Sequence, residues 1–185
     1  MAFFCVPKDL EKDRLILDSR PPNTVEPCLS KWTSTMSSAT CLGVLELDDD
    51  ECLIMSGRDI RDFFYQFKVT PERSRRNVLA GILAPEDLEF IFRQPFSKPA
   101  YVGLNTLAMG DLNSCEYAQG AHLRLILECA GAELREVMML HEPFPRGLLS
   151  VGVVIDDLVC LEKVLKGSFS GSVFQGPSEC ARRMS

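Results

Sequence analysis

The sequence lacks any C-x-x-C pair, although it contains 8 cysteines. Structural zinc sites usually show such spacing, so a zinc-based fold is not expected. There are only 2 histidines, His122 and His141, and neither has a His or Cys partner at metal-ligand spacing. We therefore predict free thiols in a reducing compartment and two histidines that are ordinary helix-face or loop residues.

Long apolar runs are also missing. No stretch reaches the roughly 18 residues that cross a bilayer, and the longest candidate, 147–161, is interrupted by Asp156 and Asp157. The apolar part of residues 1–9 is too short for a secretory signal. The sequence thus predicts an intracellular protein, in the cytoplasm or nucleus, with no membrane partner.

Positive charge is in deficit, with 20 Lys and Arg against 26 Asp and Glu and a net charge of −6. This balance argues mildly against nucleic-acid binding, because phosphate contacts need cations. The basic residues are nevertheless clustered, in 8–20 and again in 73–76, and local patches outweigh the sum. A chain of 185 residues with 46% hydrophobic content is long enough for one domain with a sizeable core.

An apolar hairpin tipped by two carboxylates is the most informative stretch. Residues 149–155 and 158–161 are dense in Val, Ile and Leu, which favours two buried strands. Asp156 and Asp157 lie between them, and Asp tolerates turn conformations. Unpaired charges beside a core are unfavourable, and a bound divalent cation offsets that effect. A solvated turn is the alternative that this stretch leaves open.

Local signals predict the remaining elements. Short strands are predicted over 14–18 and 52–55, and residues 56–59 are expected to end the second of them. A helix is predicted to start at 84–87, a long helix to run from an Asp111 N-cap to Gly131, and a second helix to cover 133–140. The Gly- and Ser-rich tail over 166–185 is predicted to be disordered.

Charged residues at three places in the chain permit two interpretations each. Arg14 and Arg20 flank a strand, where they would face an anionic ligand or simply discourage strand pairing at a solvated edge. The acidic run 48–51 would hold a cation or form a solvated loop. Asp59 would cap the following turn or act as a metal ligand beside an aromatic cluster.

Four motifs occur in an order that resembles the reverse transcriptase family, particularly the polymerases of retroelements, over about residues 6–162. Residues 14–20 with Asn23 resemble the fingers motif R-x-x-x-D-x-R-x-x-N, and 59–67 resembles the first palm motif with its leading Asp. Residues 107–114 are similar to L-P-x-G-x-x-x-S, and 154–157 to Y-x-D-D. Val154 replaces the usual Tyr and Ala108 the usual Pro; neither position is a metal ligand.

The resemblance implies an α+β fold, in which an antiparallel palm sheet is backed by helices and carries fingers insertions. It assigns fingers to about 1–47 and 68–106, and palm to about 48–67 and 107–165. The chain stops 28 positions after Asp157, and no later palm motif, thumb, RNase H or integrase region is recognisable. A partial catalytic domain is therefore expected.

The resemblance also implies RNA-directed DNA polymerase activity by two-metal phosphoryl transfer. Asp59 and Asp156 would be the main ligands of two Mg²⁺ ions, and Asp157 the third carboxylate. Magnesium suits this chemistry because it prefers oxygen ligands and keeps space for phosphates.

The implied substrates are a template-primer of RNA and DNA and deoxynucleotide triphosphates. By resemblance, Lys8 and Arg14 would hold the triphosphate, and Met109 and Gly110 would line the nucleotide pocket. Phe64 matches the family's position for the residue that excludes a ribose 2′-hydroxyl. The template-primer would be held chiefly through its backbone.

Two further hypotheses come from other functional classes. If truncation abolishes turnover, the chain would be a non-catalytic remnant that acts at most as a binding or interaction module. A metal-dependent phosphatase is the other, although no general base or nucleophile motif supports it.

Overall fold

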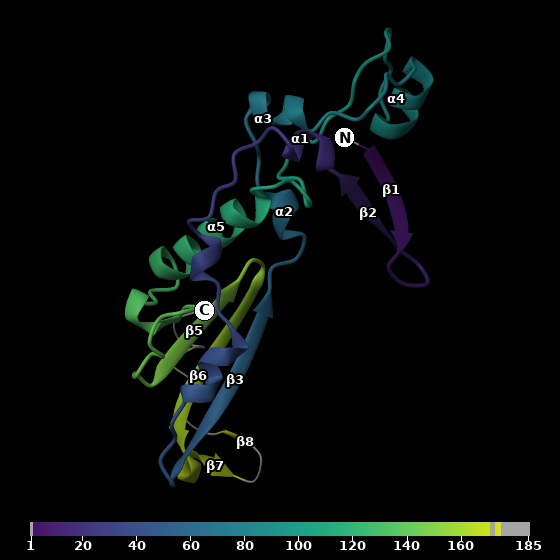
Figure 1. The fold of residues 1–185 in the computed structure, drawn as a ribbon. Coiled ribbons are helices and arrows are strands. Elements are labelled where there is room, and N and C mark those ends of the chain that lie inside the picture. Colours follow the sequence, from purple (N-terminus) through teal and green to yellow (C-terminus); the bar gives the residue numbers. More distant parts are fainter. Residues whose placement is uncertain (1, 171–172, 175–185) are drawn as a thin grey trace. The chain divides into compact units, whose positions relative to one another are not determined.

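The chain forms two compact units in the computed structural model, which describes residues 2–170 and 173–174 (Figure 1). Unit 1 consists of Met1–Leu29 and Asp62–Ser114, and unit 2 of Ser30–Arg61 and Cys115–Ser185. Both contain helices and strands, so the predicted α+β class is confirmed. Each unit is assembled from two separate stretches of sequence; their assignment to fingers and palm stays a prediction.

Unit 1 begins with an antiparallel hairpin. Strands β1 (Ala2–Pro7) and β2 (Asp13–Asp18) pair along their whole length, so the strand predicted over 14–18 is confirmed. The unit's helices are short: α1 (Arg20–Asn23), α2 (Phe63–Gln66), α3 (Pro71–Arg76) and α4 (Pro85–Phe92). Three of them carry proline in the first turn, where its fixed φ suits a helix start and its missing N–H is not needed.

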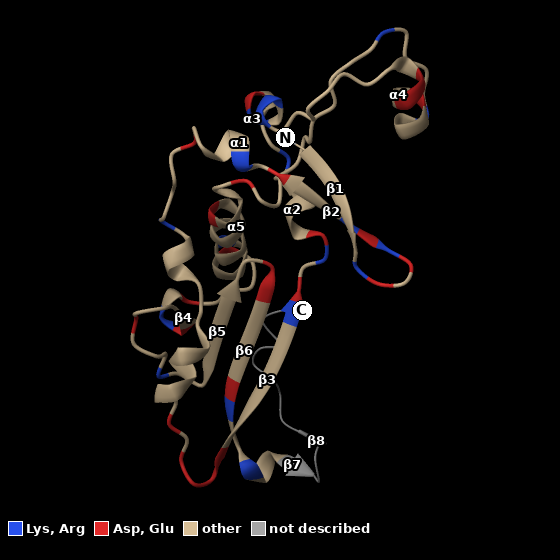
Figure 2. Ribbon diagram, turned by 45° about the vertical axis from the view of Figure 1, so that its right-hand side comes forward, with Lys and Arg blue, Asp and Glu red and all other residues tan. Residues whose placement is uncertain are grey.

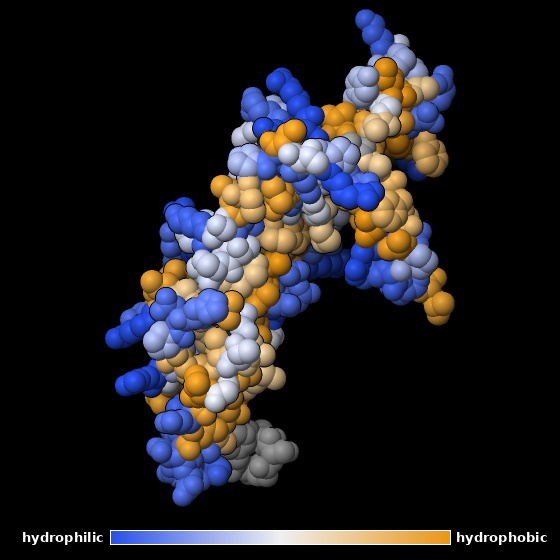
Figure 3. All heavy atoms as spheres, in the orientation of Figure 1, coloured by the Kyte–Doolittle hydropathy of each residue, from blue (hydrophilic) through white to orange (hydrophobic). Residues whose placement is uncertain are grey.

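Residues 68–106 form an excursion held by isolated antiparallel bridges, which join Lys68 to Thr106, Val78 to Gly103 and Leu83 to Ala100. Helix α4 lies within it and starts where the sequence predicts. Helix α4 carries exposed hydrophobic residues on its surface (Figure 3); Phe90, for example, is 69% exposed.

A buried ionic network ties the two sequence segments of unit 1 together. The Arg73 guanidinium lies 2.6 Å from Glu26 Oε1 and also pairs with Asp111. The amide of Asn113 donates to Glu26 at 2.6 Å. Asp111 was predicted to cap the long helix, and that prediction is wrong because its carboxylate is engaged by Arg73 while the helix begins later, at Ser114.

The pKa of Glu26 reflects two opposed influences. Burial raises it, whereas the hydrogen bonds from Asn113 and Arg73 and the charges of Arg73 and Arg76 lower it; the net pKa lies below the usual value of 4.5. The pKa of Arg73 is raised, because its bonds to Glu26 and Asp111 outweigh a desolvation that acts in the opposite direction.

Unit 2 is built on a four-stranded sheet in the order β3-β6-β5-β4. Strand β3 (Glu51–Asp59) runs antiparallel to β6 (Asp157–Leu165), which is antiparallel to β5 (Leu149–Val154); β4 (Val137–Met138) is parallel to β5. The apolar hairpin predicted from the sequence is confirmed. The prediction that 56–59 ends the first strand is wrong, because these residues continue to pair with 157–160 of β6.

Helix α5 (Ser114–Glu128) packs on one face of this sheet. The core contains Ile126 from the helix, Ala132 after it, and the inward side chains of β5 and β6: Leu149, Val151, Val153, Leu158 and Cys160. The helix predicted over 133–140 is wrong. Residues 134–136 form a single 3₁₀ turn, and then Val137 and Met138 are buried as strand β4 against β5, so strand pairing overrides local helix preference.

Short elements complete unit 2. Single 3₁₀ segments, η1 (Thr33–Thr35) and η2 (Ala39–Val44), precede β3. After β6 come η4 (Lys166–Ser168) and the short strands β7 (Phe169–Ser170) and β8 (Val173–Phe174), inside the stretch predicted to be disordered; residues 171–172 and 175–185 lie outside the described part. No helix among the described residues is long and apolar enough to cross a membrane.

The ionic network predicts acid sensitivity. Because the folded-state pKa of Glu26 is lowered, its stabilising effect is present above about pH 4.5 and is lost as pH falls through the folded-state pKa. We expect Glu26→Gln to lower the free energy of unfolding at pH 7 by about 2 kcal/mol, typical of charged hydrogen bonds, and to flatten its decline below pH 4.5. Urea unfolding followed by circular dichroism at pH 7, 5, 4 and 3 measures both.

The matched control is Glu72→Gln, which removes an exposed carboxylate from α3, the helix that carries Arg73. It should leave stability within about 0.5 kcal/mol of wild type at every pH. An equal pH dependence in wild type and Glu26→Gln would contradict the role given to this network.

Candidate functional site

Two of the three predicted metal ligands lie directly opposite each other in the sheet of unit 2. Asp59 is the last residue of β3, Asp157 is the first of β6, and the two are register partners; Figure 2 shows the acidic residues at these adjoining strand ends. Side chains of such partners have Cβ atoms roughly 5 Å apart on one face of the sheet. Both residues are exposed, so their carboxylates are open to solvent.

The third predicted ligand, Asp156, lies in the turn between β5 and β6. Val154 pairs with Asp157, which leaves Ile155 and Asp156 as a two-residue turn. The backbone N–H of Ile60, the residue after β3, donates to the carbonyl of Asp156 at 3.0 Å. The backbone of all three aspartates therefore meets at one end of the sheet.

The fit to a divalent cation is partial. Like charges directly opposite each other on neighbouring strands are unfavourable, and a hard cation with oxygen ligands would reverse that effect. The described residues, however, contain no group of three or more His, Cys, Asp or Glu side chains arranged to hold a metal ion. The geometry gives the pair of Asp59 and Asp157 as a donor set, and a three-carboxylate site stays a prediction.

The turn that carries Asp156 holds an unusual backbone conformation. Ile155 has φ of 56°, in the left-handed region. A β-branched residue is a genuine outlier there, because its Cβ crowds the backbone. Such conformations cost about 1–3 kcal/mol and persist only where surrounding contacts impose them.

Two buried side chains of α5 supply those contacts. The N–H of Ile155 donates to Gln119 Oε1 at 2.8 Å, and the carbonyl of Ile155 lies 2.7 Å from His122 Nδ1. A carbonyl oxygen only accepts, so Nδ1 of His122 carries the proton. The Gln119 amide also donates to the carbonyl of Val153 at 3.2 Å. Both backbone polar groups of Ile155 are thus held from the helix.

Sequence reasoning missed this role. His122 was predicted to be an ordinary helix-face residue, yet it is 1% exposed, and Gln119, which is fully buried, was not singled out. A signal was available: Glu116, Gln119 and His122 recur every three residues on the side of the helix that also carries Ile126. Polar residues at that spacing on a buried face indicate partners inside the fold.

Glu116 extends this buried polar row to the start of η1. Its carboxylate accepts from the backbone N–H of Trp32 at 2.6 Å and of Thr33 at 3.2 Å, and from the Thr33 hydroxyl. Burial raises the pKa of Glu116, but these hydrogen bonds outweigh it and hold the pKa below its usual value. The row therefore anchors both the preceding segment and the hairpin turn to one helix.

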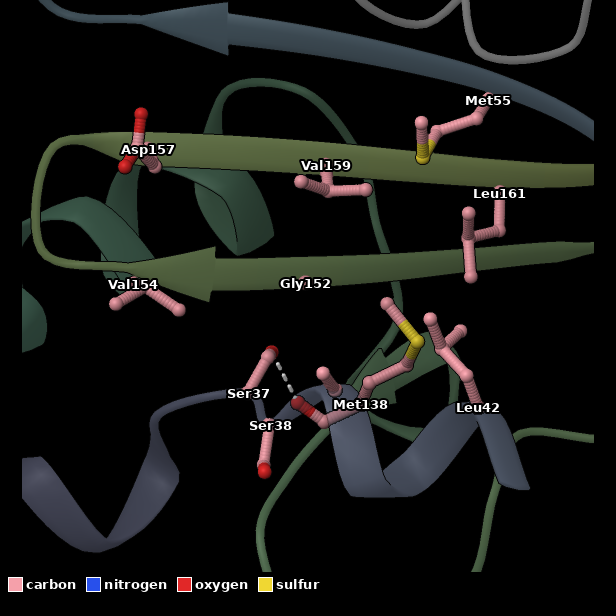
Figure 4. Close-up of a pocket in the computed structure, with 11 residues that line it drawn as sticks. Ser37, Ser38, Leu42, Met55, Met138, Gly152, Val154, Asp157, Val159 and Leu161 are labelled. Carbon is pink, nitrogen blue, oxygen red and sulfur yellow. Dashed lines mark hydrogen bonds between the residues drawn. The ribbon is translucent and has the colours of Figure 1, made fainter. Parts of the chain in front are cut away.

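A cavity of about 230 Å³ adjoins the sheet face that carries Asp157 (Figure 4). Its walls come from the segment 37–42, from β3, β4 and the β5–β6 hairpin, and its lining includes Leu42, Met55, Met138, Val159 and Leu161. Residues alternate across a strand, which places Met55, Val159 and Leu161 on the side of the Asp59–Asp157 pair. The carboxylates therefore lie at the end of a largely apolar surface.

In unit 1, three residues of the predicted fingers motif, Asp18, Arg20 and Asn23, have structural partners. Arg20 forms a two-pronged ion pair with Asp18, at 2.8 and 2.7 Å, which lowers the pKa of Asp18 to about 2. Asn23 donates to the carbonyl of Gly110 and accepts from the N–H of Leu112, both at 2.9 Å. Asn23 thereby joins the first motif to the 107–114 motif.

The five predicted nucleotide-binding residues all belong to unit 1. Lys8 and Arg14 are exposed on the β1–β2 hairpin, Phe64 is buried at 6% exposure, and Met109 is 45% exposed. Gly110 has φ of 103°, and a Cβ there would lie 3.1 Å from the carbonyl oxygen of Leu17. Close packing within unit 1 is thus sufficient reason for glycine, and its role in a nucleotide pocket stays a prediction.

The structure relates these residues in two separate sets: the aspartates within unit 2, and the nucleotide-binding residues within unit 1. Comparison of the sequence with models of protein families finds no match, and comparison with curated proteins also finds none.

Proposed function

We propose that the chain is an RNA-directed DNA polymerase domain of the retroelement type, which transfers deoxynucleotides onto a primer. The observation that carries this proposal is the register of β3 with β6. Asp59 and Asp157, far apart in sequence and each belonging to a polymerase-like motif, face each other at the end of a sheet, with Asp156 in the adjoining turn. Strand pairing thus supports the ligand set that the motif resemblance implies.

The aspartates would hold Mg²⁺ through their carboxylate oxygens. When bound, a pair of Mg²⁺ ions lowers the pKa of the primer hydroxyl and neutralises charge on the triphosphate. Asp59 and Asp157 contribute opposed carboxylates from fixed strand ends. Asp156 contributes a third carboxylate from a turn whose backbone is held by Ile60. Positions fixed before the substrate arrives need little rearrangement during reaction.

The nucleotide would be bound by residues of unit 1. Lys8 and Arg14 present cations on an exposed hairpin, and arginine offers a planar set of donors for phosphate oxygens. The ring of Phe64 would exclude a ribose 2′-hydroxyl by its size. The template-primer would be held through phosphate contacts that carry no sequence information.

A non-catalytic remnant is the second candidate. It is favoured by the finding that the side chains of the described residues form no cluster of three or more metal-ligating groups. In that case the sheet and its motifs would persist as a binding or interaction module. Activity separates the two candidates directly.

The test is extension of a DNA primer on an RNA template with Mg²⁺ and deoxynucleotides. We expect wild type to extend the primer, and Asp59→Asn and Asp157→Asn to be slower by about 100-fold or more. Charge stabilisation by bound metal is worth several kcal/mol, and each ~1.4 kcal/mol changes a rate tenfold.

Asp49→Asn serves as the matched control, because it removes an exposed carboxylate from the loop before β3 at the opposite end of the strand. It should extend primers at the wild-type rate. Absence of extension by correctly folded wild type, in a preparation that circular dichroism shows to be native, would refute the polymerase proposal and support the remnant.

Sugar selection supplies a separate prediction. Phe64→Val should raise incorporation of ribonucleotides relative to deoxynucleotides by about 10–100-fold, because a smaller side chain removes the barrier to the 2′-hydroxyl. Ratios of kcat/KM for the two nucleotide types measure it. Phe63→Val is the control, since Phe63 is the neighbouring residue of α2 and equally buried at 7% exposure. An unchanged ratio in Phe64→Val would remove this residue from the proposed site.

A further inference from the structure

The turn between β5 and β6 is constrained by a helix rather than by its own sequence. Ile155 adopts a left-handed conformation that glycine or asparagine would adopt with less strain. Gln119 and His122 hold its N–H and its carbonyl, at 2.8 and 2.7 Å. Both side chains are at least 99% buried, so water does not compete for these bonds.

These bonds fix the peptide group that leads into the aspartates. The carbonyl of Ile155 belongs to the same planar peptide as the nitrogen of Asp156, so a hydrogen bond from His122 sets the orientation at which Asp156 begins. The carbonyl of Asp156 is in turn held by the N–H of Ile60, one residue beyond Asp59. Asp156 is therefore fixed on both sides, once from α5 and once from the end of β3.

We propose that Gln119 and His122 are positioning residues that hold the β5–β6 turn, and with it Asp156 and Asp157, in the conformation in which these carboxylates bind a divalent cation. This inference rests on the proposed function. Each acts through the backbone of Ile155, to which it is hydrogen-bonded. Gln119 and His122 thus preorganise the site in the way that outer partners orient metal ligands without binding the metal themselves.

The test compares Gln119→Leu with the double variant Gln119→Leu/Ile155→Gly in the full chain. Mn²⁺ is the probe, its affinity measured by electron paramagnetic resonance of the free ion and its location by broadening of backbone amide signals. Gln119→Leu should weaken Mn²⁺ binding by about 10–100-fold, the usual effect of losing an outer partner. The double variant should recover about tenfold, because glycine adopts the turn conformation unaided.

Hydrogen exchange supplies a readout that needs no metal. The Ile155 amide should be protected in wild type and exchange faster in Gln119→Leu, where its acceptor is missing. Ile126→Val is the control: it shortens a buried side chain on the same helix and leaves the turn bonds intact. It should lower the free energy of unfolding in urea without changing Mn²⁺ affinity or Ile155 exchange.

The outcomes separate this inference from the function on which it rests. If Asp157→Asn abolishes Mn²⁺ binding while Gln119→Leu binds as tightly as wild type, the polymerase proposal survives and the positioning role is overturned. Recovery of stability without affinity in the double variant overturns it as well. If wild type binds Mn²⁺ no better than Asp157→Asn, the metal site itself is refuted, and the positioning role with it.

Discussion

The pairing of β3 with β6 is the constraint on which the candidate site depends. Nine register pairs run from Glu51 with Leu165 to Asp59 with Asp157. The pairing of Asp59 with Asp157 is therefore fixed by the eight pairs that precede it. A shift by one residue would turn Asp59 to the opposite face of the sheet. The buried side chains of β6 fix how that strand faces, because Leu158 and Cys160 lie in the core beneath α5. Hydrophobic packing on one face of β6 thus places Asp157 on the other face, and strand pairing places Asp59 opposite it.

Motif residues in the two units differ in how far structure alone accounts for them. Asp18 pairs with Arg20, Asn23 bonds the backbone at Gly110, and Gly110 packs against Leu17, so each has a stabilising role inside unit 1. The Asp59–Asp157 pair is the opposite case. Two like charges placed in register weaken a sheet rather than stabilise it. A residue pair that weakens the sheet locally is where a functional explanation is most needed.

Helix α5 contacts both the hairpin turn and the core, because its buried face is polar where it meets the turn and apolar further along. Glu116, Gln119 and His122 satisfy backbone groups that strand pairing leaves open, and Ile126 then enters the core. Buried polar groups are expensive unless fully bonded, so such a row specifies one arrangement of helix, loop and hairpin. The strained φ of Ile155 is sustained by the same contacts.

The sequence by itself determined the β5–β6 hairpin, the strand over 14–18, the start of α4 and the α+β class, because apolar runs and proline signals act over a few residues. It also indicated Asp59, Asp156 and Asp157 as a set, although only by motif resemblance. Tertiary structure decided the rest. Residues 56–59 are strand because they pair with β6. Val137 and Met138 form a strand instead of the predicted helix because they pair with β5. The carboxylate of Asp111 pairs with Arg73 instead of capping the helix. Each outcome depends on a partner distant in sequence, and local propensities of about 1 kcal/mol or less do not outweigh such contacts.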